Sequence, residues 1–180
     1  MKTIAIKVGW LLLLGATVFV TGLIAAPGDL DPTFGAGGIV TTDFFGSDNF
    51  ATAIAVQPDG KIIVAGEALS GTQKTFALIR YNSDGSIDAT FGSDGKVLTT
   101  FSDRDSRAYE IVLQPDQKIV LAGDSFHGDP LSDSDFALAR YNSEGTLDQS
   151  FGSGGLSSAA PIPKESFSGR SGARTLAAAG

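Results

Sequence analysis

One feature constrains the fold of this chain more than any other, and it is an internal repeat. The block Asp31-Pro-Thr-Phe-Gly35 returns as Asp88-Ala-Thr-Phe-Gly92 and again as Asp148-Gln-Ser-Phe-Gly152. Self-similarity at a long, nearly fixed period is the mark of an architecture built from repeated structural units, each of which packs against its neighbours. We therefore expect two full repeats, about residues 31–87 and 88–147, and the start of a third at 148–155.

Two longer blocks support this division. Gln57–Gly66 matches Gln114–Gly123 at seven of ten positions, and Phe76–Gly92 matches Phe136–Gly152 at eleven of seventeen. The offset is 57 residues for the first block and 60 for the second. The second repeat therefore carries a three-residue insertion, which we place in the loop Asp124–Asp135.

Each repeat reads as four short strands in a meander. Pro58-Asp59-Gly60 predicts a tight turn, and the apolar run Ile62–Ala65 predicts a strand that is buried on both faces. Four antiparallel strands buried on both faces are typical of a propeller blade, and the fold class is all-β. The expected strands are Ile39–Phe44, Ala51–Gln57, Lys61–Gly66 and Phe76–Asn82, with Val97–Phe101 and Ala108–Gln114 as copies of the first two.

The motifs of these repeats resemble those of the delta-60 repeat family. They are Gly85–Gly92, Gln57–Gly66 and Phe76–Asn82, with copies at Gly145–Gly152 and Phe136–Asn142. The resemblance covers about residues 29–155 and implies a β-propeller-like fold in exported or surface proteins of bacteria. It carries over no catalytic residue and no established biochemical activity.

The number of repeats departs from the family pattern, which has many more. Residues 156–180 lack periodicity, and we expect a disordered tail there. Two blades cannot close a ring, which leaves four alternatives open: a homo-oligomer that completes the ring, an open pair of sheets, a repacked small barrel, or a truncated fragment without independent activity.

The N-terminus has the pattern of an export signal. Lys2 and Lys7 precede nineteen uncharged residues, Val8–Ala26, which end on the small residues Ala25 and Ala26. A positive start, an apolar middle and a small-residue end predict a helical signal peptide over residues 1–26, cleaved after Ala25 or Ala26. The alternative is an uncleaved anchor, since nineteen residues are just long enough to span a bilayer. We expect a secreted, periplasmic or cell-surface protein.

Composition narrows the class of partner. The formal net charge of −7 argues against a nucleic-acid partner, and no stripe of lysine or arginine runs along the chain. The chain has no cysteine, which excludes disulfides and thiolate chemistry. A surface protein or a glycan is the partner class that we expect, and a membrane only if the N-terminal segment is retained.

Two acidic loops contain residues of the kind that bind metal ions. Asn82–Asp88 contains part of a calcium-loop pattern, but Arg80 and Phe91 stand where an EF-hand needs acids, so we interpret it as a turn. The loop Asp124–Asp135 holds the sole histidine, His127, and four aspartates: Asp124, Asp129, Asp133 and Asp135. We interpret it as a solvated acidic loop and expect no cofactor, with calcium as the remaining alternative.

The repeated polar residues are interpreted as structural. Asp31, Asp88 and Asp148 precede a Thr/Ser-Phe-Gly sequence in every copy, and an aspartate there can cap the turn while Phe34, Phe91 and Phe151 fill the space between blades. Arg80 and Arg140 are expected to pair with a nearby aspartate rather than a ligand. We predict no catalytic residue and a non-catalytic binding scaffold, with a carboxylate-based glycan hydrolase as the less favoured alternative.

Overall fold

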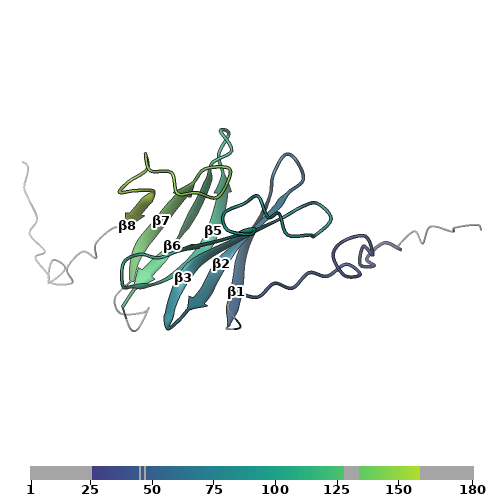
Figure 1. The fold of residues 1–180 in the computed structure, drawn as a ribbon, viewed down its shortest axis with the longest axis horizontal. Coiled ribbons are helices and arrows are strands. Elements are labelled where there is room, and N and C mark those ends of the chain that lie inside the picture. Colours follow the sequence, from purple (N-terminus) through teal and green to yellow (C-terminus); the bar gives the residue numbers. More distant parts are fainter. Residues whose placement is uncertain (1–25, 45, 47, 128–133, 159–180) are drawn as a thin grey trace, which may run out of the picture.

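The protein consists of two four-stranded antiparallel sheets, as shown by a computed structural model that describes residues 26–44, 46, 48–127 and 134–158. The sheets lie against each other, and the N-terminal described segment and β8 are at opposite ends of the pair (Figure 1). Sheet 1 contains β1 (Asn49–Val56), β2 (Ile62–Ser70), β3 (Gln73–Tyr81) and β4 (Lys96–Thr99). Sheet 2 contains β5 (Asp105–Leu113), β6 (Ile119–Phe126), β7 (Ser134–Tyr141) and β8 (Leu156–Ser158). The predicted all-β fold class is confirmed.

The sheets do not begin where the sequence repeats begin. In each sheet the strand order follows the chain, β1-β2-β3-β4 and β5-β6-β7-β8, with every pair antiparallel. β4 lies in the second sequence repeat but pairs with β3 of the first, with Phe76 opposite Thr99. Each sheet therefore takes three strands from one repeat and its fourth from the next.

This arrangement corrects one predicted strand. Ile39–Phe44 was expected to be the first strand of the first blade, but it belongs to neither sheet and makes one isolated bridge, between Ile39 and Gly35. The physical reason is pairing. Its copy becomes β4 by using the free edge of β3, and no sheet among the described residues offers Ile39–Phe44 the equivalent edge.

The C-terminal boundary is corrected as well. Leu156–Ser158 forms β8 on the edge of β7, although the sequence pattern placed a disordered tail from residue 156 onward. Backbone hydrogen bonds to β7 hold these residues in a strand, and such bonds do not depend on the type of side chain. Residues 159–180 and the proposed signal helix at 1–25 lie outside the described part of the chain. Within that part, no helix is long and apolar enough to cross a membrane.

The main core lies between the two sheets. We call the face of each sheet that carries Tyr81 or Tyr141 its leading face, and the opposite face, with Phe76 or Phe136, its trailing face. The trailing face of sheet 1 packs on the leading face of sheet 2. The buried residues of this core are Ile63, Ala65, Phe76, Leu78, Phe91, Phe101, Ala108, Ile111, Ile119, Leu121, Ala137, Ala139 and Tyr141.

A second, smaller cluster covers the leading face of sheet 1. Phe44 packs there against Ala77, Ile79 and Tyr81, with Val40 beside it. The segment that failed to form a strand therefore still contributes to the core. Sheet 1 is covered on one face by a whole sheet and on the other by a single stretch of chain.

Both sheets contain a bulge at the same place, where a glycine meets the neighbouring backbone. Gly66 lies opposite the bulge in β1, and a Cβ added to Gly66 would overlap the carbonyl oxygen of Phe50. Gly123 has the same relation to Arg107. Glycine inside a strand marks such close approaches of two backbones.

Gly66→Ala is therefore expected to destabilise the protein by about 1–3 kcal/mol, because the methyl group forces β1 and β2 apart. Urea unfolding followed by circular dichroism measures this. Ser70→Ala, at the exposed end of the same strand, is the control and is expected to change stability by less than about 0.5 kcal/mol. Equal effects of the two variants would contradict the close approach.

Candidate functional site

A cluster of polar side chains is built around Asp88, in the copy of the Asp-x-Thr/Ser-Phe-Gly motif that lies between the two sheets. Asp88 Oδ1 accepts hydrogen bonds from Thr90 N at 3.1 Å and Thr90 Oγ1 at 2.6 Å. The backbone NH of Phe91 donates to the Asp88 carbonyl oxygen at 3.1 Å. These bonds close the turn, as the sequence predicted, and direct the Phe91 ring into the main core.

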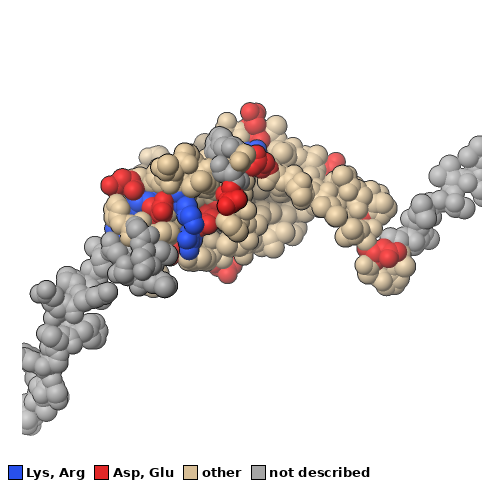
Figure 2. Space-filling view, turned by 90° about the horizontal axis from the view of Figure 1, so that it is seen from below, with Lys and Arg blue, Asp and Glu red and all other residues tan. Residues whose placement is uncertain are grey.

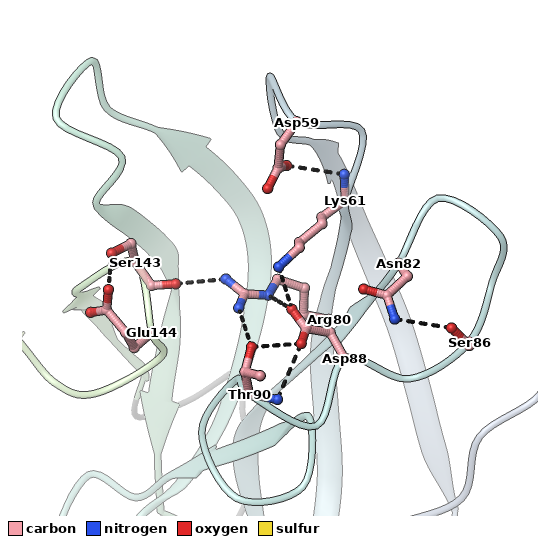
Figure 3. A network of polar contacts seen from close by, with 9 residues as sticks. All are labelled: Asp59, Lys61, Arg80, Asn82, Ser86, Asp88, Thr90, Ser143 and Glu144. Atoms are coloured by element: carbon pink, nitrogen blue, oxygen red, sulfur yellow. Dashed lines mark hydrogen bonds and ion pairs between the residues drawn. The ribbon is translucent and has the colours of Figure 1, made fainter.

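The other carboxylate oxygen of Asp88 accepts from two basic residues. Arg80 Nε donates to Oδ2 at 2.7 Å, and Lys61 Nζ lies 2.9 Å from the same atom (Figure 3). Arg80 Nη1 also donates to the carbonyl oxygen of Ser143, in the second repeat, at 2.7 Å. The predicted pairing of Arg80 with an aspartate is confirmed, and the contact with Ser143 ties the two repeats together.

The second repeat contains a copy of this network. Arg140 Nε donates to Asp148 Oδ2 at 2.8 Å, and Lys118 Nζ lies 3.0 Å from it. Ser150 takes the place of Thr90, with its Oγ 2.7 Å from Asp148 Oδ1. The copy is more open, because the Arg140 side chain is 21% exposed against 8% for Arg80.

The two networks also stack arginine on phenylalanine. The Arg80 guanidinium carbon lies 4.5 Å from the centre of the Phe91 ring, and that of Arg140 lies 4.6 Å from the centre of Phe151. A guanidinium at this distance from a ring face is attracted by the ring's quadrupole. Each arginine is therefore fixed both by a carboxylate and by the ring of the same motif.

These contacts determine the protonation of both carboxyl groups. Burial would raise the pKa of Asp88, but the hydrogen bonds from Thr90 and Lys61 and the charge of Arg80 outweigh it and hold that pKa well below its usual range. Hydrogen bonds from Ser150 and Lys118 hold the pKa of Asp148 well below its usual range too. Both groups are therefore carboxylates at neutral pH and cannot act as general acids there.

The calcium-like loop Asn82–Asp88 is held by contacts of its own. Asp84 Oδ1 accepts from Ser86 N at 2.9 Å and from Ser86 Oγ at 2.6 Å, and Asn82 Nδ2 donates to Ser86 Oγ. Asp88, the last acid of the pattern, is directed into the Arg80 network instead. The structure thus gives the loop's acids separate partners, and among the described residues no three His, Asp or Glu side chains gather as a metal site requires.

The structure also separates the acids of the histidine loop. Asp124 Oδ2 accepts from Tyr109 and Ser134, both at 3.1 Å, whereas Asp135 pairs with Arg104 at 3.2 Å. His127 Nε2 is 3.7 Å from the exposed Asp103, a residue that the sequence reasoning did not consider. Asp129 and Asp133 lie outside the described residues.

Sequence reasoning missed an apolar groove on the leading face of sheet 1. It has a volume of about 340 Å³ and lies between the Phe34–Phe44 segment and the sheet. Its lining includes Val40, Phe44, Phe50 and Ile54. A signal was present, since Ile54 and Val56 alternate with alanines in the sequence, but which face of a strand stays open depends on how the sheets stack.

The surface drawn in Figure 2 shows how the charges are distributed. Basic side chains lie beside acidic ones at one end of the sheets, and much of the remaining surface in that view is uncharged. Lys61, Lys118, Arg80 and Arg140 each contact an aspartate in the networks described above. The basic groups of the repeats are thus engaged within the protein.

Comparison with known protein families agrees with the geometry. The family described as a domain of unknown function (DUF5122) beta-propeller matches residues 57–91 and 114–151. Each repeat thus carries a DUF5122 match. The matches run from the Gln-Pro-Asp turn to the phenylalanine of the Asp-x-Thr/Ser-Phe-Gly motif and so include both charge networks. A search of curated proteins found no match to the chain.

The DUF5122 beta-propeller matches cover β2 and β3 of sheet 1 and β6 and β7 of sheet 2, and they name no activity. The four-stranded antiparallel meander is the blade that a β-propeller predicts. Because fold alone does not determine function, the role of the chain has to be argued from its own side chains.

Proposed function

We propose that this chain is an exported, non-catalytic β-repeat protein that acts as a binding scaffold at the cell surface or outside the cell. One observation carries the proposal: the arginine, aspartate and lysine of the charge network, which are common to both repeats, are engaged in holding turns and joining sheets. Asp88 and Arg80 contact each other, Thr90, Lys61 and Ser143, and the second copy repeats the pattern at Asp148 and Arg140. A catalytic centre rarely occurs twice in equivalent form in one chain.

The location and the partner rest on other features. The apolar, lysine-flanked N-terminal segment supports export, and the motif resemblance to delta-60 repeats agrees with a surface protein. The acidic net charge supports a protein or glycan partner and no nucleic acid. Loops joined to a rigid sheet scaffold are the usual place for such binding.

The proposal predicts binding without turnover. The full chain is expressed with its N-terminal segment, its location and new N-terminus are determined by fractionation and mass spectrometry, and the purified product is assayed on a glycan array and on chromogenic glycosides. We expect export, cleavage after Ala25 or Ala26, and no hydrolysis, with and without millimolar calcium. Hydrolysis that a single Asp→Asn substitution abolishes would show an enzyme, and a cytoplasmic, uncleaved product would contradict export.

A further inference from the structure

The junction between the two repeats shows how one copy of the unit binds the next. The segment 88–101 lies on the leading face of sheet 2, where Tyr141 Oη donates to Thr99 Oγ1 at 2.7 Å and Gly92 N donates to the Glu144 carbonyl oxygen at 2.8 Å. The same segment provides β4, which pairs with β3 of sheet 1. It therefore pairs as a strand with sheet 1 and contacts sheet 2 through the Thr99 side chain and the Gly92 backbone.

Segment 31–44 makes the same contacts with sheet 1. Tyr81 Oη donates to Thr42 Oγ1 at 2.7 Å, and Gly35 N donates to the Asp84 carbonyl oxygen at 2.8 Å. What it lacks among the described residues is the other half of the junction, a sheet edge to pair with. It occupies the position that the fourth strand of a preceding blade would take, and the described residues supply no such blade.

The outer faces of the two sheets differ in exposure from their copies at the internal junction. Ile54, on the leading face of sheet 1, is 66% exposed, whereas its copy Ile111 is 7% exposed. Phe136, on the trailing face of sheet 2, is 84% exposed, whereas its copy Phe76 is fully buried. The two open faces are thus copies of the two faces that pack together inside the chain, so they are complementary to each other.

The edge of sheet 2 is also poorly completed by its own β8. Ser157 and Ser158 stand where β4 has Val97 and Leu98, and a cavity of about 400 Å³ lies beside them. At the internal junction Phe76 packs edge-to-face on Phe101, with ring centres 4.9 Å apart. No described residue takes the place of Phe101 beside Phe136. The segment 31–44 retains two of these three side chains, as Val40 and Phe44, and has Thr41 in place of Leu98.

We propose that a second copy of this chain binds head to tail, with segment 31–44 of one copy replacing segment 148–158 on sheet 2 of the next. Ile39–Phe44 then pairs with β7, the leading face of sheet 1 covers the trailing face of sheet 2, and Phe44 packs on Phe136. Added strands of this kind combine backbone hydrogen bonds with side-chain packing. The inference does not depend on the proposed binding function.

Replacing segment 148–158 by segment 31–44 keeps an aspartate in the charge network of Arg140 and Lys118. Asp31 Oδ1 is held by Thr33 N and Oγ1, as Asp88 is held by Thr90, and no basic residue in the described part of the chain pairs with Asp31. In the proposed assembly Asp31 takes the place of Asp148 beside Arg140 and Lys118. At least two contacts are not reproduced. The Arg107–Glu67 ion pair between the sheets has Phe50 and Asp124 at the corresponding positions. Thr52, whose Oγ1 donates to the Ala108 carbonyl oxygen at 2.7 Å, has Tyr109 as its copy.

The interface joins two different faces, so each added copy exposes the same two faces again. Such an interface produces a closed ring when the rotation between units completes a circle, and propellers close at about four to eight blades. With two blades in the described part of each chain, we expect a ring of about two to four copies.

Light scattering coupled to size exclusion on the mature protein gives the first test. We expect a discrete oligomer of about two to four copies for the wild type and for Phe136→Leu. Phe136→Glu is expected to weaken association at least tenfold, since a charge replaces a buried aromatic anchor. The Phe136→Glu monomer should still fold with a melting temperature equal to that of the wild-type monomer, because Phe136 is exposed within one copy.

Cysteine cross-linking gives a second test, which distinguishes the proposed interface from non-specific association. The chain has no cysteine, so the double variant Thr42→Cys with Phe136→Cys adds one designed pair, copied from the opposed residues Thr99 and Phe76. Opposed residues lie within disulfide reach. In the control, Thr41→Cys with Phe136→Cys, the first cysteine points to the opposite face of the strand.

We expect intermolecular disulfides in the first pair and at least tenfold fewer in the control. A mature protein that is monomeric at micromolar concentration, an oligomer that Phe136→Glu leaves intact, or equal cross-linking in both pairs would each overturn the proposal. A protein that only aggregates without a discrete size would do so too and would favour an incomplete propeller fragment.

Discussion

Phe91→Ala is expected to lower the free energy of unfolding by about 3–5 kcal/mol, the largest loss for any single side chain of the repeat motifs. The Phe91 ring is fully buried in the main core between the sheets. It contacts the Gly145 loop of the second repeat on one side and the Arg80 guanidinium on the other. Removing the ring leaves a cavity at the junction and takes away the surface on which Arg80 lies.

Phe151 provides a matched control inside the same molecule. It occupies the same motif in the third copy, with Arg140 against its ring, but it is half-buried and no described residue plays the part of Gly145. Phe151→Ala is therefore expected to cost no more than about 1 kcal/mol. Urea unfolding of both variants gives the comparison. Similar losses would show that Phe91 owes its effect to its own turn rather than to the junction between the sheets.

The sequence predicts the units of this fold better than it predicts their boundaries. Strand pattern and turn chemistry locate β2 and β3 because hydrophobic periodicity and the Pro58-Asp59-Gly60 turn are local signals. The free edge of β3 decides which sheet Lys96–Thr99 joins. This pairing cannot be predicted from the types of residue in the segment. The same cause explains why the predicted strand Ile39–Phe44 has no partner.

The charge network was predictable in part. Arg80 and Asp88 are eight residues apart on either side of one turn, so their pairing follows from local geometry. Lys61 joins from the residue just before β2, 27 residues away, and Ser143 joins from the next repeat. The recurrence of the lysine in both Gln-Pro-Asp motifs was a usable signal for Lys61. The contact with Ser143 depends on how the repeats stack, which the sequence does not specify.

Asp88→Asn is expected to destabilise the protein by about 3 kcal/mol or more at neutral pH, because it removes the carboxylate from between Arg80 and Lys61 and leaves a buried guanidinium without its counter-ion. The amide has the same size and can still bind Thr90, so the change isolates the charge. Asp103→Asn is the control. Its side chain is 85% exposed, and the expected change is below about 0.5 kcal/mol.

The pH dependence of this loss distinguishes an electrostatic cause from a steric one. The pKa of Asp88 is lower in the folded protein than in the unfolded chain, where an aspartate titrates near pH ~3.9. Its contribution to stability is therefore complete above the unfolded pKa and is lost as the pH falls toward the folded pKa. Urea unfolding from pH 7 down to about pH 3 should show the gap between wild type and Asp88→Asn narrowing in acid. The gap between wild type and Asp103→Asn should stay small throughout. A gap for Asp88→Asn that is constant with pH would mean that the loss comes from shape, and the carboxylate would then have no electrostatic role in joining the two repeats.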